Sequence, residues 1–356
     1  MNHIVSITAL KNIDEQQTSL FISSISHSLL YTSLPYLNLL ETFLQCEIQI
    51  ITVYDKTKLI GYFPLAFKHN NLYGTVCNSL PFYGSNGGMI VEDDENQNTT
   101  RKLLLNEFNN LISSKKCVAY TVISNPLDAS GDNWLRENIP HNLVDERVGQ
   151  ITHFPSNSNI NIELDLLNLF EDPRPRNIRK AQKEGVKVYV SNTKEELNFL
   201  YKTHYDNITA INGIAKDKRF FDLLSEKFTD DEYKIYIAEY NGEKIAALLI
   251  FFYNKTVEYF TPAVVEKYRN LQPTVLIIYQ AMLDAVVNGY KNWNWGGTWL
   301  SQGGVYDFKK KWGTKDYPYF YYTKIIDEKI YKLSKEILLN EYPYFFVLPF
   351  SALKND

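Results

Sequence analysis

One lysine near the C-terminal end of the chain lies between aromatic residues, in the segment GGVYDFKKKWG at 303–313. Val305, Phe308 and Trp312 recur at the spacing of one helix face, which turns Lys309 toward a different face. Such a lysine can be an ordinary surface residue whose stem covers apolar neighbours. Held at the end of a sheet, it can instead stabilise a developing oxyanion or a phosphate. The spacing leaves both interpretations open.

A second candidate is a basic segment, residues 174–187, in which the one acidic residue is Glu184. Prolines at its start and Gly185 near its end predict a helix. Guanidinium groups match phosphate oxygens with paired hydrogen bonds, and the basic residues recur about one turn apart. The pattern is compatible with a solvated helix surface and with an anion site. The residues predicted for that site are Arg176, Arg179 and Lys180.

Two glycine-containing turns follow predicted strands. The first, within residues 80–90, lacks the lysine of a P-loop and the spacing of a Rossmann loop, so turn formation is its simpler explanation. Its backbone N–H groups would nevertheless suit a sugar or a phosphate. The second, at 295–298, is a strand-end turn or a backbone ligand site. The predicted substrate-binding residues of the first turn are Tyr83, Gly84, Ser85 and Asn86.

The elements that must position these segments occur twice. Residues 48–65 and 234–250 each predict two strands joined by a tight turn. Tyr54 corresponds to Tyr240 with an offset of 186 residues, because 240 minus 54 is 186. The same offset relates Lys58 to Lys244. An internal duplication of one α/β unit explains this agreement better than chance.

Each predicted hairpin is followed by a further strand, a helix and another strand. Between the copies, residues 160–166 alternate like a strand. The other predicted ranges are 72–76, 101–112 and 117–123 in the first copy, and 256–261, 275–288 and 291–295 in the second.

Composition limits the function classes. The chain has 356 residues, which suggests two domains at roughly 150 residues each. It carries 45% hydrophobic and 22% charged residues, as folded globular proteins do, and its net charge of -4 argues against a protein dedicated to coating nucleic acid. Neither a metal-ligand spacing nor a G-x-S-x-G motif occurs, which disfavours metal-dependent and serine hydrolysis.

The sequence also predicts a compartment. Three cysteines in apolar contexts favour reduced thiols, and neither a signal peptide nor a spanning apolar run occurs. We therefore expect a cytoplasmic protein without a transmembrane segment. The aromatic tail, residues 342–350, contains two prolines and at most makes a peripheral contact with a membrane or another subunit.

Two motifs carry a resemblance to a known family: RNIRKAxKxGV at 176–186 and GGVYDFKxxWG at 303–313. Together with the duplicated order of elements, they resemble the FemAB-like branch of the GNAT acyltransferase superfamily. The resemblance implies an α/β (α+β) fold with tandem GNAT-like domains, each a mixed, mostly antiparallel sheet flanked by helices. The expected divisions are an N-terminal domain at 1–165, a C-terminal domain at 166–325, and a helix with the aromatic tail at 326–356.

By resemblance, the chain transfers an acyl group from an activated carrier to an amine. Lys309 is then the catalytic residue near the reacting carbonyl, and Arg179 contacts phosphates of the acceptor. Ordinary GNAT enzymes carry a glycine-containing pyrophosphate loop where this chain has residues 269–274, so Gln272 and Thr274 are the predicted cofactor-binding residues. The remaining residues predicted to bind substrate are Tyr259, Gln302 and Tyr306.

Three functions remain open. The first is an N-acyltransferase acting on an amino group of a nucleotide-linked or lipid-linked envelope sugar, in polysaccharide synthesis, with acetyl-CoA or another acyl-CoA as donor. The second is a peptidoglycan peptidyltransferase that uses aminoacyl-tRNA and a peptidoglycan precursor. The third is a non-catalytic binding protein on the same fold. No metal is expected in any of them.

Overall fold

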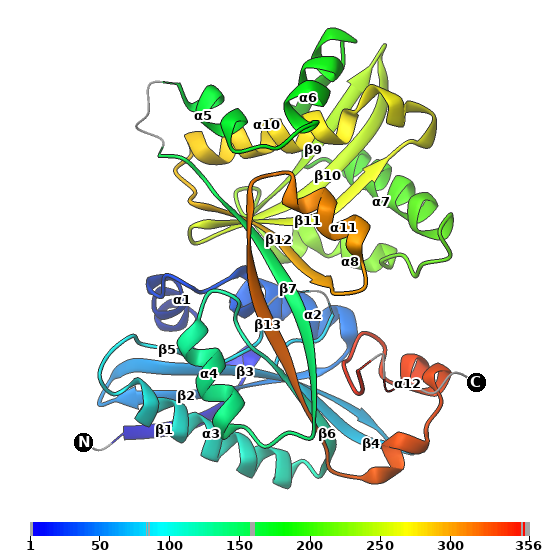
Figure 1. Ribbon diagram of the computed structural model, residues 1–356. Coiled ribbons are helices and arrows are strands. Elements are labelled where there is room, and N and C mark those ends of the chain that lie inside the picture. Colours follow the sequence, from blue (N-terminus) through cyan, green and yellow to red (C-terminus); the bar gives the residue numbers. More distant parts are fainter. Residues whose placement is uncertain (1–2, 83, 85, 157–160, 350–351, 353–356) are drawn as a thin grey trace. The chain divides into compact units, whose positions relative to one another are not determined.

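The computed structural model describes residues 3–82, 84, 86–156, 161–349 and 352, whose elements are shown in Figure 1. Contacts divide the chain into two compact units. Unit 1 contains Met1–Val148 and Pro318–Asp356, and unit 2 contains Gly149–Tyr317. The chain passes from one unit to the other inside two strands, β7 (Leu143–His153) and β13 (Thr314–Ile325).

Unit 1 contains a sheet in the order β1-β2-β3-β4-β6-β13, with β5 paired to β3. Neighbours are antiparallel except for β4 and β6, which are parallel. The strands are β1 (His3–Ala9), β2 (Glu47–Asp55), β3 (Lys58–Asn70), β4 (Gly74–Asn78), β5 (Ile90–Val91) and β6 (Cys117–Ile123), and the α-helices are α1 (Glu15–Ser24), α2 (Leu34–Leu44), α3 (Gln97–Ser114), α4 (Ala129–Asn138) and α12 (Lys335–Glu341).

Unit 2 repeats this order as β7-β12-β11-β10-β9-β8, and its strands β11 and β12, like β4 and β6, are parallel. Its own strands are β8 (Lys187–Val190), β9 (Tyr233–Tyr240), β10 (Glu243–Tyr253), β11 (Thr256–Val264) and β12 (Asn292–Trp299). Its helices are α5 (Ile162–Asn168), α6 (Arg174–Lys183), α7 (Lys194–Thr209), α8 (Lys218–Asp222), α9 (Leu224–Lys227), α10 (Pro273–Val287) and α11 (Gly303–Lys310). The predicted fold class is confirmed.

Short 3-10 helices complete the description: η1 (Leu10–Asn12), η2 (Leu30–Thr32), η3 (Glu266–Leu271) and η4 (Glu328–Lys332). No helix in the described ranges is long and apolar enough to cross a bilayer.

Each unit has its own apolar core. In unit 1 the ring of Phe108 on α3 lies 5.6 Å from that of Phe63 on β3 and 4.9 Å from that of Tyr120 on β6. In unit 2 α10 packs on β9, β10 and β11, and both Ile277 and Met282 are fully buried. Because α10 is apolar over most of its surface, it can be stable only inside such a core.

The hairpins repeat, although one residue away from the predicted register. Their two-residue turns begin at Lys56 and Asn241, both with positive φ. In each hairpin one residue of the second strand bulges out of the ladder, Ile60 in β3 and Ile245 in β10. These equivalent positions are 185 residues apart, not 186. The duplication therefore holds, but with an offset of 185 the counterpart of Tyr54 is Glu239. The predicted counterpart, Tyr240, is one residue away and so points to the other face of the strand.

The predicted division of the chain differs from the two units. The strand that completes the sheet of unit 1 is β13, which follows the second copy in sequence. It runs antiparallel to β6, from Tyr321 opposite Ile123 to Ile325 opposite Ala119. A single boundary near residue 165 cannot place β13 in unit 1. The chain passes between the units twice instead, at 148/149 and at 317/318.

The C-terminal tail also differs from its prediction. Tyr342, Phe345 and Val347 are buried within unit 1, and the amide N–H of Phe346 donates to Oδ1 of Asn78 at 2.7 Å. Residues 326–349 are therefore part of unit 1, and these aromatic side chains are not available as a membrane anchor.

The strand predicted at residues 160–166 is also wrong. Ile160 lies outside the described residues, and the segment that follows is α5 instead of a strand. The side chain of Asn161 accepts a hydrogen bond from the amide of Leu164 at 3.0 Å, and two acidic residues occupy the first turn. A side-chain cap and negative charge at a helix N-terminus outweigh the alternating pattern.

Candidate active site

The parallel ladder between β11 and β12 is short. It runs from Thr256 opposite Asn292 to Glu258 opposite Asn294, although both strands continue, to Val264 and Trp299. Beyond the end of this ladder β11 contributes Tyr259 and residues 262–264 to a pocket of about 440 Å³. The pocket therefore begins where β11 stops pairing with β12.

The pocket lies entirely in unit 2, and we call it the β11 pocket. Its walls combine the second half of β11 with the start of α10 and with one residue each from α6, α7 and α11. The lining residues are Arg174, Asn207, Tyr259, Pro262, Ala263, Val264, Arg269, Gln272, Pro273, Thr274, Val275 and Phe308. Three predicted site residues, Tyr259, Gln272 and Thr274, are therefore brought together.

The start of α10 offers few free backbone donors to the pocket. Pro273, its first residue, has no N–H, and the amides of Val275 and Leu276 donate to the carbonyl of Gln272. Gln272 also accepts a hydrogen bond from Asn177 Nδ2 at its own Oε1, at 3.0 Å. A ligand phosphate would therefore meet mainly the amide and hydroxyl of Thr274 and the neighbouring side chains.

Lys309 lies on α11 and is 6% exposed. Its ammonium donates to the carbonyls of Gly296 and Gly297, at 3.4 and 3.2 Å, and to Thr298 Oγ1 at 2.8 Å. These acceptors belong to the second glycine-containing segment of the sequence, which was predicted as a strand-end turn but lies inside β12. They are all neutral, and burial lowers the pKa of Lys309 to about 8. A cation held by neutral dipoles keeps its charge available for a developing oxyanion.

A glutamine that the sequence did not single out supports this lysine. Gln150 on β7 is fully buried, and its Oε1 accepts a hydrogen bond from Thr298 Oγ1 at 3.3 Å. Its Nε2 donates to the carbonyl of Tyr306 at 3.2 Å. Gln150 therefore connects the segment of β12 that holds Lys309 with α11, the helix that carries Lys309. A lone glutamine in a strand gives no sequence signal for such a role.

The aromatic residues around Lys309 pack on a different cation. The guanidinium of Arg174, at the start of α6, lies 4.4 Å from the ring centroid of Phe308 and 5.2 Å from that of Trp312. One of its terminal nitrogens, Nη2, donates to the carbonyl of Phe308 at 2.9 Å. The sequence prediction placed Phe308 and Trp312 around Lys309 and missed Arg174 as a site residue.

The glycine that closes this motif has a steric role. Gly313 has φ +71°, and a Cβ there would lie 2.5 Å from the carbonyl oxygen of Leu169. The backbone before α6 thus passes too close for any side chain.

The other predicted cations and polar residues of unit 2 lie outside the pocket lining. Arg176, Arg179 and Lys180 are exposed on α6. Gln302 is exposed at the N-cap of α11, and the hydroxyl of Tyr306 donates to Asp316 at 2.7 Å.

In unit 1 the predicted turn makes internal contacts. Asn86 is fully buried, and its Oδ1 accepts the amide of Gly88 at 3.0 Å, so it shapes its own loop. Gly84 is half-buried, whereas Tyr83 and Ser85 lie outside the described residues. The predicted substrate contact of Asn86 does not fit this burial.

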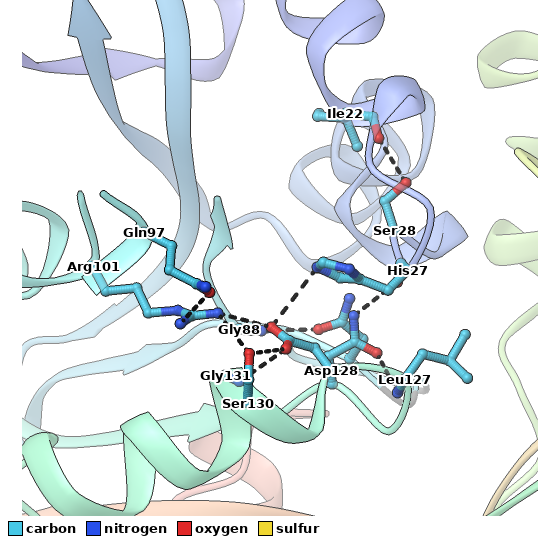
Figure 2. Close-up of polar contacts among 12 residues, drawn as sticks. Ile22, His27, Ser28, Gly88, Gln97, Arg101, Leu127, Asp128, Ser130 and Gly131 are labelled. Atoms are coloured by element: carbon cyan, nitrogen blue, oxygen red, sulfur yellow. Dashed lines mark hydrogen bonds and ion pairs between the residues drawn. The ribbon is translucent and has the colours of Figure 1, made fainter. Parts of the chain in front are cut away.

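A second cluster of polar contacts in unit 1 surrounds Asp128, which caps α4 by accepting the amide of Gly131 at 2.8 Å (Figure 2). Its Oδ2 lies 3.4 Å from Nη2 of Arg101 and 3.8 Å from Nε2 of His27. Burial lowers the pKa of His27, so this imidazole is neutral at pH 7. These contacts hold α3 and α4 together and leave Asp128 a structural role.

Comparison with known proteins agrees with this geometry. Residues 175–310, which carry Lys309 and most of the β11 pocket, match the family model described as acetyltransferase (GNAT) domain. No curated protein matches the chain significantly in sequence.

Solved structures share the fold over nearly the whole chain. FemX is similar at 17% identity and a TM-score of 0.73, over 93% of this chain and 99% of its own. A conserved Bacteroides thetaiotaomicron protein of unknown function follows at 10% and 0.55, over 90% and 100%. A tandem GNAT protein of the clavulanic acid biosynthesis pathway gives 9% and 0.51, over 90% and 98%. The predicted resemblance is confirmed: residues 175–310 match a GNAT acetyltransferase domain, and the chain shares the fold of FemX.

Proposed function

We propose that the chain transfers an acyl group from an activated carrier to an amino group of a cell-envelope precursor and so forms an amide. The observation that carries the proposal is the buried ammonium of Lys309, which is held by neutral acceptors one residue from the pocket wall at Phe308. A cation held near the donor site can stabilise the oxyanion through which such a transfer passes.

The chemistry assigned to Lys309 is electrostatic. The nitrogen of a neutral acceptor amine attacks the acyl carbonyl, a C–N bond forms, and the carbonyl electron pair moves to oxygen. Lys309 stabilises this oxyanion by about 3 kcal/mol. When the intermediate collapses, the bond from carbon to the carrier's sulfur or oxygen breaks, and the amine proton passes to the leaving group. The lysine itself stays protonated throughout.

The acyl donor is proposed to occupy the β11 pocket. The acetyltransferase family model supports an acyl-CoA, whereas the few free amides at the start of α10 and the fold shared with FemX support an aminoacyl-tRNA. The acceptor then follows the donor: an amino sugar linked to a nucleotide or lipid in the first case, a peptidoglycan precursor in the second. Exposed Arg176, Arg179 and Lys180 are proposed to bind the acceptor's phosphates, since guanidinium and ammonium groups suit them.

The test incubates the purified protein with radiolabelled acetyl-CoA or charged tRNA, each with UDP-linked amino sugars or UDP-linked muramyl peptides. Label in an amide product identifies the donor and acceptor together. Transfer from neither donor, in protein that is folded by circular dichroism, would contradict the proposed function and support a binding protein.

A further inference from the structure

Arg174 is a buried cation whose charge is not balanced in the described structure. It is 8% exposed, and no carboxylate of the described residues forms an ion pair with it. Its Nε is buried and has no hydrogen-bond partner among those residues. Burial lowers its pKa from the usual arginine value, yet an arginine remains charged at neutral pH. An unpaired buried charge costs free energy unless a ligand completes it.

The surroundings of Arg174 fix its direction. Its guanidinium plane is held by two aromatic rings, and Nη2 is fixed on the carbonyl of Phe308. Arg174 lines the β11 pocket, and the described lining contains two arginines and no carboxylate. No acidic side chain of that lining therefore faces Arg174. The second arginine, Arg269, is already paired with Glu266. Arg174 therefore keeps a donor without a partner, Nε, in the wall of the pocket.

We infer that Arg174 binds a phosphate of the acyl donor's nucleotide carrier in the β11 pocket, between its guanidinium and Thr274 at the start of α10. This inference rests on the proposed function, which makes the ligand of this pocket an acyl donor. Phosphate is favoured over a neutral ligand because the guanidinium fork and a helix N-terminus both suit an anion. The phosphate can belong to the pyrophosphate of coenzyme A or to the phosphodiester of a tRNA 3′ end, and the test separates these sources.

The experiment measures binding by calorimetry, with two pairs of probes. Coenzyme A is compared with pantetheine, which lacks its phosphates, and an RNA oligonucleotide ending in CCA is compared with adenosine. We expect Arg174→Gln to lower the affinity for one phosphate-bearing probe about 10- to 100-fold. The affinity for the phosphate-free member of the same pair should not change. The probe affected identifies the source.

Two controls accompany the variant. Lys183→Gln removes an exposed charge from the same helix and should leave both affinities unchanged. Arg174→Lys retains charge but loses the guanidinium fork, and should give an intermediate loss. If the substitutions at 174 prevent folding, the Nε–H proton signal of Arg174 in the wild-type protein should still shift on titration with the phosphate-bearing probe.

The inference is overturned if wild-type protein binds neither phosphate-bearing probe, or if Arg174→Gln weakens both members of a pair equally. Transfer activity distinguishes it from the proposed function. A protein that uses phosphate-free and phosphate-bearing donors equally well would refute the inference alone. A protein that binds its carrier through Arg174 but transfers nothing would refute the proposed function alone.

Discussion

Unit 1 and unit 2 have the same strand order but differ at one place. In unit 2 the parallel ladder of β11 and β12 ends at Glu258 opposite Asn294, and the β11 pocket opens beyond it. The corresponding last pair in unit 1 is Asn78 opposite Thr121. There the contacts continue, because the amide of Ser79 donates to the carbonyl of Thr121 at 3.0 Å.

The C-terminal tail completes this difference. The carbonyl of Phe346 accepts hydrogen bonds from Asn78 Nδ2 and Thr121 Oγ1, both at 2.9 Å. The tail thus occupies, in unit 1, the position from which a ligand pocket begins in unit 2. A duplicated scaffold therefore does not duplicate a site: one copy keeps its strand ends open, and the other closes them with its own chain.

The largest expected effect tests whether the chemistry belongs to unit 2. Lys309→Met should lower kcat about tenfold to a thousandfold and leave donor binding nearly unchanged, because the ammonium acts on charge that develops only in the transition state. Lys310→Met, at an exposed neighbouring position, is the control and should keep wild-type activity. Equal losses in both variants would indicate a diffuse basic patch and remove the contrast between the units.

A glycine pair sharpens the description of unit 2. Gly313→Ala should lower the free energy of unfolding by about 2–4 kcal/mol, since it adds a clash with the carbonyl of Leu169 to an unfavourable φ. Gly185→Ala has a similar φ of +85° but meets nothing within 4 Å, so its cost should be about 1 kcal/mol. Urea unfolding measures both, and equal losses would show that the close approach is relaxed in solution.

The tail contact can be broken at one residue of unit 1. Asn78→Ala leaves the N–H of Phe346 without its buried partner and removes one of the two donors to the carbonyl of Phe346, so it should cost about 1–3 kcal/mol in urea unfolding. Asn110→Ala, on the exposed face of α3, should cost little. Donor binding to the β11 pocket should not change in either variant. Loss of transfer activity in Asn78→Ala without loss of stability would mean that the tail takes part in the reaction.

The pH dependence should identify the charge state of Lys309. With a pKa of about 8, the cation is present below that pH, so kcat should fall as the pH rises above it. The unfolded chain keeps this proton up to about pH 10.4, so Lys309 should contribute a rise in stability between these two values. Lys309→Met should lack both effects. A kcat that is flat from pH 7 to 10 in the wild-type protein would argue against a required cation.

The sequence predicted the fold better than the site, for a physical reason. Strand pairs and α10 follow from local apolar patterns, and these were placed within a few residues. Lys309 was also found locally, because aromatic residues surround it in sequence. Arg174 and Gln150 depend instead on contacts with residues more than a hundred positions away, Phe308 and Thr298. The exchange of β7 and β13 is equally nonlocal, and no pattern inside either strand indicates it.

The smallest expected effect concerns the exposed face of α6, where Arg176 and Arg179 lie in solvent, unlike the buried Arg174 of the same helix. Changing Arg176 and Arg179 together to Ala should raise the acceptor KM about threefold to tenfold, because solvent-exposed charges contribute only about 0.3–0.7 kcal/mol each. Stability and donor affinity should stay at wild-type values, since both side chains are exposed. Steady-state kinetics at two salt concentrations measure this, and the effect should shrink at higher ionic strength. An unchanged KM would leave these arginines as a solvated surface and restrict anion binding in unit 2 to the β11 pocket.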